Sequence, residues 1–295
     1  MIRKHLLQTA IHLCLIVTAV FCRQNSYGAE FAFRQGVGGY ISVHTIKDDD
    51  SLVELARHYD IGYNEIVAAN PGIDPFVPTV GTKVMIPKKW LLPDVRLRDG
   101  IVINLSEMRL YYFHPRTKEL IDTFPIGIGD EGWDTPLGTY SIIEKIVNPA
   151  WHVPRSIRAQ KPELAEIVPA GPDNPLGTHA LRLSIGSVLI HGTNHPFGIG
   201  RRVSHGCIHL YPEDIVKLFK KVRRGTKVVI IRQPVKIAAA GDRVLAEVHG
   251  DEEIDLEQEA INLLDRKNLF ARVDLGKLMT VLKANYGMPT DVTKE

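Results

Sequence analysis

The sequence HGTNHPFGIGRRVSHGCIHL occupies residues 191–210 and carries the strongest chemical signal in the chain. Within it Cys207 follows a glycine, and His191 and His205 lie near it in sequence. Attack on an amide requires a thiolate, a base that generates the thiolate, and N–H donors for the developing oxyanion. An unperturbed thiol has a pKa of about 8.5, so a neighbouring histidine can form a thiolate–imidazolium pair with it. Gly206 has no side chain, so backbone N–H groups there can approach a substrate carbonyl. The stretch predicts a cysteine nucleophile.

A helix is predicted directly after this stretch. Pro212 suits the first helical position, and Glu213 and Asp214 suit the positive end of a helix. Apolar residues then recur on one face until Gly225 ends the pattern. The start of this helix would add a weak positive field near a Cys207 thiolate.

The segments on either side of the stretch have the alternating or continuous apolar runs that are typical of β-strands. The predicted strands cover residues 101–105, 108–113, 122–128, 141–147, 181–190 and 227–231. Residues 148–180 contain six prolines and few periodic runs. Because long loops inside a compact domain are usually functional, we expect an irregular lid there. The sequence therefore predicts a mainly β domain over residues 99–232.

This domain resembles the L,D-transpeptidase catalytic domain of the YkuD type. The likeness rests on His191-Gly192 and, after a spacer, on Ser204-His205-Gly206-Cys207. It implies a β-sandwich in which Cys207 is the nucleophile and His191 is the general base and acid. It further implies that the Gly192 carbonyl orients the imidazole, as the carboxylate does in a serine protease triad. The same resemblance implies that His205 and the N–H groups of Gly206 and Cys207 bind the oxyanion or the donor peptide.

One position departs from the family pattern, because His209 stands where the family usually has arginine. An arginine is a permanent, forked donor for a carboxylate, whereas a histidine is weaker and depends on pH. Either Arg201 or Arg202 takes over this role, or binding is altered. Together with Ser204 and Thr193, these residues are the expected substrate contacts.

An N-terminal unit over residues 41–88 has the predicted order strand, helix, helix, strand. Ser51 and Glu54 form a capping box before a helical run, and a second short helix is expected over residues 64–69. A strand over residues 83–86 is expected to close at Pro87. This unit is similar to a LysM domain, which implies that it binds the N-acetylglucosamine-containing glycan of cell walls. The alternative is a structural adaptor that binds nothing.

Residues 1–29 have the layout of a secretory signal peptide. Arg3 and Lys4 precede an apolar run over residues 6–21, and residues 26–29 supply small side chains for cleavage. Cleavage changes the formal net charge from +2 to −1, because it removes three basic residues and no acidic one, and it leaves Cys207 as the only cysteine. An uncleaved anchor or lipidation at Cys22 are the alternatives. The small net charge does not support nucleic-acid binding.

The C-terminal residues 233–295 are acidic past residue 250 and have helical patterns over 256–264 and 275–286. We expect a solvated, partly helical extension here. Docking to a partner is the alternative.

The whole layout resembles the ErfK/YbiS/YcfS/YnhG group of periplasmic L,D-transpeptidases. The resemblance implies a periplasmic enzyme that needs no cofactor or metal and acts on the peptide stems of peptidoglycan. Cys207 would release D-alanine from a tetrapeptide stem and form a thioacyl-enzyme. The acceptor would be an outer-membrane lipoprotein lysine, another diaminopimelate, a D-amino acid or water.

Two other functions fit parts of the pattern. The residues His205, Cys207 and His209 occupy alternate positions, so they would share one face of a strand. His191 and His195 are near them in the sequence. Zinc binds such nitrogen and sulfur ligands in a tetrahedron. A periplasmic zinc peptidase would follow. The other alternative is a wall-binding protein whose β domain has lost catalysis.

Overall fold

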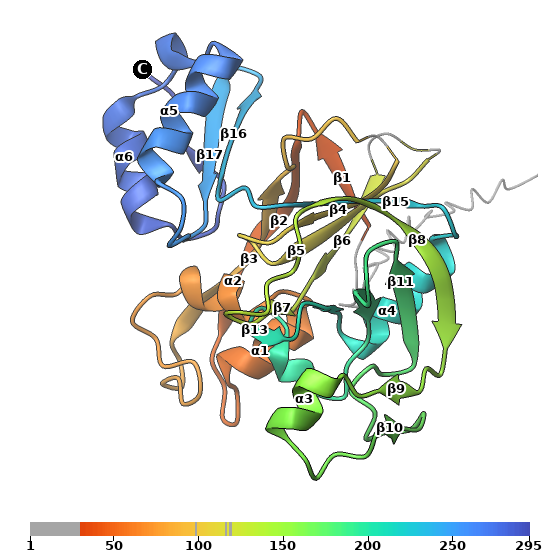
Figure 1. Cartoon of the computed structure of the whole chain (residues 1–295). Helices are drawn as coiled ribbons and strands as arrows, with labels where there is room; N and C mark the ends of the chain where they lie inside the picture. The colour runs from red at the N-terminus through yellow and green to blue at the C-terminus, as the bar shows by residue number, and fades with distance from the viewer. Residues whose placement is uncertain (1–29, 98, 116, 118–119) are drawn as a thin grey trace, which may run out of the picture.

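The computed structural model describes residues 30–295 except 98, 116 and 118–119. The predicted signal peptide over residues 1–29 lies outside the described residues. In Figure 1 the N-terminal unit and the central β domain adjoin each other, and a C-terminal domain stands at one end of them. Within the described part of the chain, no helix combines the length and the hydrophobicity needed to cross a membrane.

Among the described residues, eleven strands form one sheet, which confirms the prediction of a mainly β fold. Its order is β14-β12-β11-β8-β15-β4-β5-β6-β1-β2-β3. Most neighbours are antiparallel, but β15 pairs in parallel with β4, and β14 in parallel with β12. The central strands are β4 (Gly100–Asn104), β5 (Arg109–Phe113), β6 (Leu120–Pro125), β8 (Gly138–Val147) and β15 (Lys227–Ile231).

Helix α4 (Pro212–Lys221) follows the cysteine, as predicted, and packs on the sheet. Ile215 and Leu218 are fully buried in a core that also contains Ile190 and Ile208, which lie on the strands beside the cysteine. Full burial of each such side chain stabilises the fold by roughly 1.5–3 kcal/mol. The helix therefore holds the two strands that carry the candidate site.

The N-terminal unit has the predicted order, with β2 (Val37–Thr45), α1 (Leu52–Tyr59), α2 (Tyr63–Ala68) and β3 (Lys83–Leu91). Ser51 caps α1, because its Oγ accepts the N–H of Glu54 at 3.2 Å. The prediction that the last strand closes at Pro87 is wrong. Pro87 pairs with Ile41 inside β3, which is the last strand in the sheet order. At such an edge the missing proline N–H removes no ladder bond.

The N-terminal unit is continuous with the β domain. Strand β1 (Glu30–Arg34) pairs with β2 on one side and with β6 on the other. A buried ion pair adds to the contact: Arg109 Nη2 lies 2.6 Å from Glu65 Oε2. Trp90 Nε1–H donates to the other oxygen of Glu65 at 2.8 Å. These bonds fix α2 against β5 and β3, so the unit is not a freely tethered module.

The segment over residues 148–180 is more ordered than predicted. It contains α3 (Arg155–Gln160) and a pair of short strands, β9 (Trp151–His152) and β10 (Ile167–Val168). Asn174 is buried, and its amide donates to the carbonyls of Pro149 and Pro169 at 2.9 and 3.0 Å. These bonds join residues far apart in the segment, which local periodicity does not reveal.

The run over residues 181–190 is not one strand. It forms the hairpin of β11 (His179–Leu183) and β12 (Leu189–His191). Gly186 has φ +48° in the turn between them, a conformation that glycine adopts at little cost. Three further short strands complete this region: β7 (Ile128–Gly129), β13 (Arg202–Ser204) and β14 (Ile208–His209).

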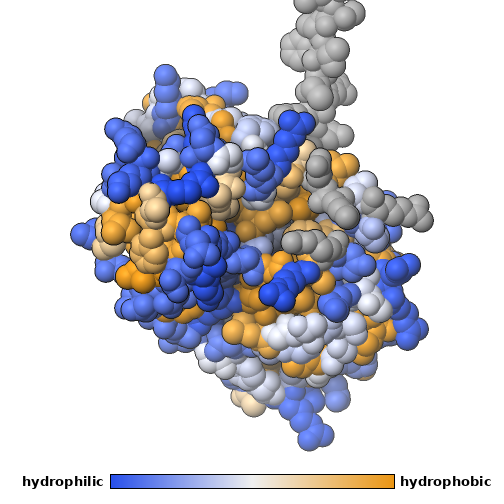
Figure 2. All heavy atoms as spheres, turned by 90° about the horizontal axis from the view of Figure 1, so that it is seen from above, coloured by the Kyte–Doolittle hydropathy of each residue, from blue (hydrophilic) through white to orange (hydrophobic). Residues whose placement is uncertain are grey.

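Residues 233–295 are not a solvated helical extension, because they form a domain with a core of its own. Strands β16 (Val235–Ala240), β17 (Arg243–Val248) and β18 (Thr290–Asp291) pair with one another, and α5 (Leu256–Lys267) and α6 (Leu275–Ala284) cover them. Val235, Leu264 and Val292 are fully buried there. Hydrophilic and hydrophobic residues are interspersed on the face seen from above in Figure 2.

Candidate active site

Cys207 lies in a tight turn between β13 and β14. Gly206 has φ +92°, which a side chain would disfavour. Ser204 is buried, and its hydroxyl donates to the Cys207 carbonyl at 2.6 Å, which fixes the turn. Among the described residues, no hydrogen bond uses the N–H of Gly206 or of Cys207. Both donors therefore remain free to bind a substrate oxygen.

His191 reaches the same place from the end of β12. The parallel pairing of β12 with β14 sets His191 opposite His209, two residues after the cysteine. The imidazole Nδ1–H donates to the Gly192 carbonyl at 2.6 Å, the bond that the resemblance implies. This bond leaves Nε2 without the proton in the neutral ring, so Nε2 can act as a base. The rings of His191 and His209 lie 4.5 Å apart between centroids.

Burial keeps the cysteine and both histidines neutral. It lowers the pKa of His191 to about 4, although the backbone bond to Gly192 opposes the shift. Burial likewise raises the pKa of the Cys207 thiol, against the opposing effects of the Leu189 backbone and the Arg182 guanidinium. Burial, with smaller effects from His191 and a neighbouring histidine, lowers the pKa of His209 well below its ordinary value. Because desolvation penalises both charged forms, these shifts favour the neutral thiol and imidazole over the predicted thiolate–imidazolium pair in the unliganded protein.

A cavity of about 570 Å³ opens over these groups. Its lining brings together six residues expected to act in catalysis or binding: His191, Thr193, Ser204, His205, Cys207 and His209. The 148–180 segment supplies another wall, as expected of a lid: Trp151, His152, Pro154, Ile157, Lys161, Leu164, Pro175 and Leu176. The sulfur faces the β11–β12 turn, and its S–H donates to the Ser187 carbonyl at 3.9 Å.

The two arginines expected to replace the family arginine lie elsewhere. The guanidinium of Arg201 stacks on the Tyr63 ring, 3.7 Å from its centroid. Arg202 pairs with Asp134 at 2.5 Å. Neither lines the cavity. The arginine that does line it is Arg182 on β11.

Arg182 is a residue that the sequence reasoning missed. Its Nε–H donates to Glu144 at 2.8 Å, and its charge partly offsets the rise that burial causes in the pKa of the Cys207 thiol. The only sequence feature that pointed to Arg182 was its position between Leu181 and Leu183 in an apolar run. The alternation of side chains in a strand is enough to explain a charged residue there.

The other expected residues have clear partners. The Thr193 Oγ1 accepts the N–H of His195 at 2.9 Å, which shapes the loop after His191. His205 packs against Trp133, with 4.7 Å between ring centroids. A side chain at Gly192 would come within 3.0 Å of Ile215, so glycine allows α4 to pack closely behind the site.

The geometry does not favour the zinc interpretation. Among the described residues, neither group of side chains arranged to share an ion includes Cys207 or the histidines beside it. Each group also has a lysine at its carboxylates: Lys221 Nζ lies 2.7 Å from Asp122, and Lys236 Nζ lies 2.7 Å from Glu107.

Comparison with known proteins agrees with this fold and site. A family model for the L,D-transpeptidase catalytic domain (YkuD) matches residues 98–230, and a LysM domain model matches residues 44–87. The chain belongs to the L,D-transpeptidase family, and it is an L,D-transpeptidase. The resemblance stated from the sequence motifs is thereby confirmed.

Three relatives show the extent of the similarity. "Probable L,D-transpeptidase YcfS" of Escherichia coli K12 is 43% identical over 268 residues, which are 85% of this chain and 83% of that protein. "Probable L,D-transpeptidase YbiS" of the same strain is 44% identical over 212 residues, 69% of this chain and 68% of that protein. "Probable L,D-transpeptidase ErfK/SrfK" of Salmonella typhimurium is 37% identical over 260 residues, 82% of each protein.

Proposed function

We propose that this L,D-transpeptidase is exported to the periplasm and acts on the tetrapeptide stems of peptidoglycan through a thioacyl-enzyme at Cys207. His191 is the general base and acid. The observation that carries the proposal is the cavity in which the Cys207 sulfur and an oriented, neutral His191 lie together. Export rests on the basic and apolar pattern of residues 1–29.

In the first step the sulfur attacks the carbonyl that joins the L-centre of diaminopimelate to D-alanine. His191 Nε2 takes the thiol proton as the S–C bond forms, and the N–H groups of Gly206 and Cys207 bind the oxyanion. The imidazolium then gives this proton to the leaving nitrogen as the C–N bond breaks. D-alanine departs, and the stem remains on Cys207 as a thioester.

In the second step an amine attacks the thioester carbonyl. His191 takes a proton from the attacking nitrogen and returns it to sulfur as the C–S bond breaks, so an amide and the free thiol result. The acceptor is the lysine of an outer-membrane lipoprotein or a second diaminopimelate. Each amine can be supplied separately to the isolated thioester, and the new amide can be identified by mass spectrometry. This experiment distinguishes attachment of a lipoprotein from cross-linking of two stems.

Ser204 and Thr193 are positioning residues in this proposal, since their hydrogen bonds shape the loops that carry Cys207 and His191. His205 lines the cavity, where it contacts the donor peptide. His209 is neutral beside His191, so it contributes shape and a hydrogen-bonding group rather than a permanent charge. Arg182 is one of two cations in the cavity wall, with Lys161, and is available to a substrate carboxylate.

Intact-protein mass spectrometry of the mature chain with a diaminopimelate tetrapeptide tests the donor step. We expect a transient adduct of the stem without D-alanine, and no adduct on Cys207→Ala. His191→Ala should fold and form the adduct at least ~10²-fold more slowly, because it lacks the general base. Release of D-alanine by Cys207→Ala at the unaltered rate would contradict the mechanism. Bound zinc in the native mass would support the peptidase alternative.

A further inference from the structure

The walls of the catalytic cavity are basic. Among the described residues, they contain one arginine and one lysine, but neither aspartate nor glutamate. Arg182 lies on β11, whereas Lys161 follows α3 in the segment over residues 148–180. The donor stem carries one carboxylate on D-alanine and another on the far centre of diaminopimelate. The position of each cation therefore decides which carboxylate it meets.

Arg182 lies on the sheet face that carries the reacting groups. In the β11–β12 hairpin it pairs with Leu189, two residues before His191. Because side chains alternate along a strand, Leu189 and His191 point to one face, and both line the cavity with Arg182. The Cys207 side chain packs on the buried cluster that contains Leu189. Arg182 is therefore close to both the sulfur and the base.

The Arg182 guanidinium is oriented by one bond and keeps its other donors free. Its Nε–H donates to Glu144 at 2.8 Å, and the two residues are direct partners in the register of β11 and β8. Glu144 does not line the cavity. Within the part of the chain that the structure describes, no hydrogen bond or ion pair involves the two terminal nitrogens of Arg182. Such a pair of nitrogens forms a fork that fits a carboxylate.

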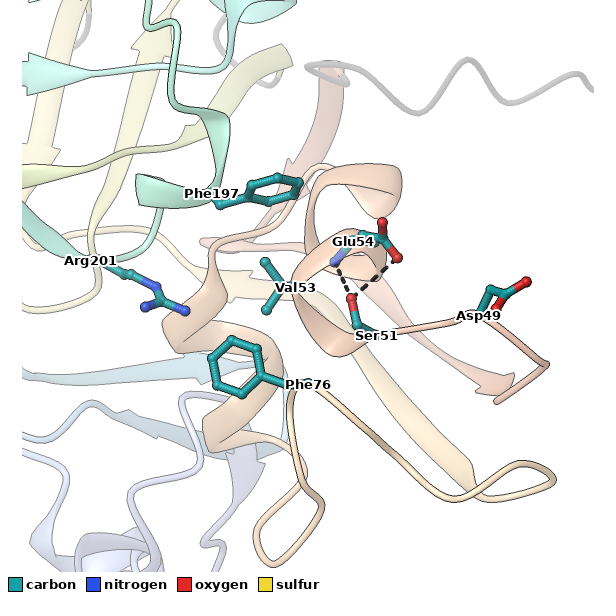
Figure 3. A pocket seen from close by; sticks show the side chains of 7 residues that line it. All are labelled: Asp49, Ser51, Val53, Glu54, Phe76, Phe197 and Arg201. Atoms are coloured by element: carbon teal, nitrogen blue, oxygen red, sulfur yellow. Dashed lines mark hydrogen bonds between the residues drawn. The ribbon is translucent and has the colours of Figure 1, made fainter.

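The two arginines that precede the cysteine in sequence are directed away from the cavity. Arg201 lies beside Val53 and Phe76 of the N-terminal unit, as Figure 3 shows. Arg202 pairs with Asp134. Neither arginine lines the cavity. A stem bound there therefore meets a different arginine, the one on β11.

The chemistry of the donor step brings one carboxylate to this position. The leaving nitrogen of D-alanine takes its proton from His191. A single carbon separates this nitrogen from the D-alanine carboxylate, which therefore lies within about 5 Å of the attacked carbonyl carbon. Arg182 and His191 are diagonal neighbours across the strand pair, about 7–8 Å apart along the backbone and within reach of long side chains. The carboxylate on the far centre of diaminopimelate is several bonds more distant.

We propose that Arg182 binds the carboxylate of the departing D-alanine and is a specificity-determining residue for the donor stem. The proposal rests on the proposed function and assigns one carboxylate of the substrate to one residue. The two terminal nitrogens of Arg182 bind the carboxylate, and Glu144 holds them in that orientation. The enzyme therefore prefers a stem whose D-alanine carboxylate is free to one in which this group is neutral.

The same contact acts on one kind of acceptor. Attack of a D-amino acid on the thioester reverses the release of D-alanine, so its amine and carboxylate occupy the positions of the leaving group. Arg182 therefore favours a D-amino acid over its amide as acceptor. The side-chain amine of a peptide lysine has no carboxylate beside it, so transfer to lysine does not depend on Arg182.

The donor contact is tested with two stems that differ only in their last group, D-alanine or D-alaninamide. Mass spectrometry measures the rate at which each acylates Cys207. In the wild type kcat/KM should be about tenfold to a hundredfold higher for the D-alanine stem, because a hydrogen bond to a charged group has an effect of that size. Arg182→Gln should bring this ratio close to one. Arg182→Lys should keep part of the ratio, because it keeps the charge and loses the fork.

Two further variants are controls. Lys161→Met removes the other cation of the cavity wall and should leave the ratio at its wild-type value, whatever it does to the separate rates. Arg243→Gln removes an arginine that is 68% exposed on the C-terminal domain and pairs with Asp291 through Nε. It should change neither rate.

The ratio of the two rates separates recognition from a structural role. A variant that only alters the fold or the reactivity of Cys207 slows both stems equally. Equal rates for the two stems in the wild type, a comparison that needs no variant, would overturn the proposal. An unchanged ratio in Arg182→Gln would also overturn it. If neither stem acylates Cys207, the proposed function itself is refuted.

The acceptor contact is tested on the isolated thioester. D-alanine, D-alaninamide and a lysine peptide are supplied separately, and the new amide is measured by mass spectrometry. Arg182→Gln should slow transfer to D-alanine about tenfold or more and leave transfer to the lysine peptide and to D-alaninamide unchanged. Equal slowing of all three would contradict a contact with the carboxylate.

Discussion

At the scale of the residue, desolvation favours the uncharged forms of Cys207 and His191 in the empty cavity. Burial raises the pKa of the Cys207 thiol and lowers that of His191 to about 4, so proton transfer between them is unfavourable in the empty cavity. The thiolate is the form that oxidants attack. A protonated resting thiol is therefore less open to oxidation than a thiolate, and in the proposed mechanism proton transfer to His191 coincides with attack on the substrate.

Alkylation of Cys207 tests this resting state. The rate with iodoacetamide follows the thiolate fraction. Because burial raises the thiol pKa above its ordinary value, the rate should keep rising as the pH passes 9. Cys207 is the only cysteine in residues 30–295, so mass spectrometry of the intact protein with this range measures the rate directly. A plateau reached near neutral pH would mean that the thiolate–imidazolium pair exists after all.

The titration of His191 tests the same resting state on the acid side. Its pKa of about 4 predicts that the imidazole stays neutral, and competent as a base, down to about pH 4. A histidine in the unfolded chain has a pKa near 6.5. Between pH 6.5 and pH 4 the unfolded chain therefore binds more protons than the folded one. The contribution of His191 to stability is lost as the pH falls from about 6.5 to about 4. NMR of ¹⁵N-labelled histidine, with His191→Asn to assign the signal, measures the midpoint. A midpoint near 6.5 would contradict the burial argument.

At the scale of the element, residues far apart in the chain meet through strand register. The parallel pairing of β12 with β14 places His191 opposite His209 and so brings the imidazole to the turn that carries Cys207. The motif predicted that these residues act together, because their spacing matches a family pattern. It could not predict the partners of Arg201 and Arg202, since Tyr63 and Asp134 are distant in sequence.

The joint between α2 and β5 yields a stability prediction. Glu65→Ala leaves the buried guanidinium of Arg109 without its counter-ion and should destabilise the fold by about 3–5 kcal/mol. Glu54→Ala, which removes an exposed carboxylate in the same domain, should change stability far less. Thermal unfolding followed by circular dichroism measures both. Equal melting temperatures for the two variants would indicate that the ion pair does not stabilise the contact between α2 and β5.

The elements themselves were predicted unevenly, for physical reasons. The cap at Ser51 and the helix after Cys207 are local signals, and both are confirmed. The order within the 148–180 segment depends on the long-range bonds of Asn174, and the passage of β3 through Pro87 depends on its place at the sheet edge. Local periodicity carries neither kind of information.

At the scale of the molecule, the C-terminal domain is attached through buried charges. Lys236 is 2% exposed, and its ammonium lies 2.7 Å from both Glu107 of the catalytic domain and Glu247 of its own domain. Glu247 also accepts the N–H of Leu91 from β3 and pairs with His249. From the sequence, this region shows only charged residues and short helical patterns. The partners of Lys236 are not visible there, because Glu107 lies more than a hundred residues away and Glu247 lies across a strand pair.

Replacing this lysine tests whether the domains unfold together. Lys236→Met leaves the buried carboxylates of Glu107 and Glu247 without their lysine, which should destabilise the protein by about 3–5 kcal/mol. Lys277→Met removes an exposed partner of Glu295 and should change stability far less. In differential scanning calorimetry we expect Lys236→Met to lower the melting temperature of the whole chain, and Glu107→Gln in the same chain to restore part of it by removing one buried charge. The contrary result is a separate transition for the C-terminal domain, with the melting temperature of the catalytic domain unchanged. It would mean that the buried ion cluster does not couple the unfolding of the two domains.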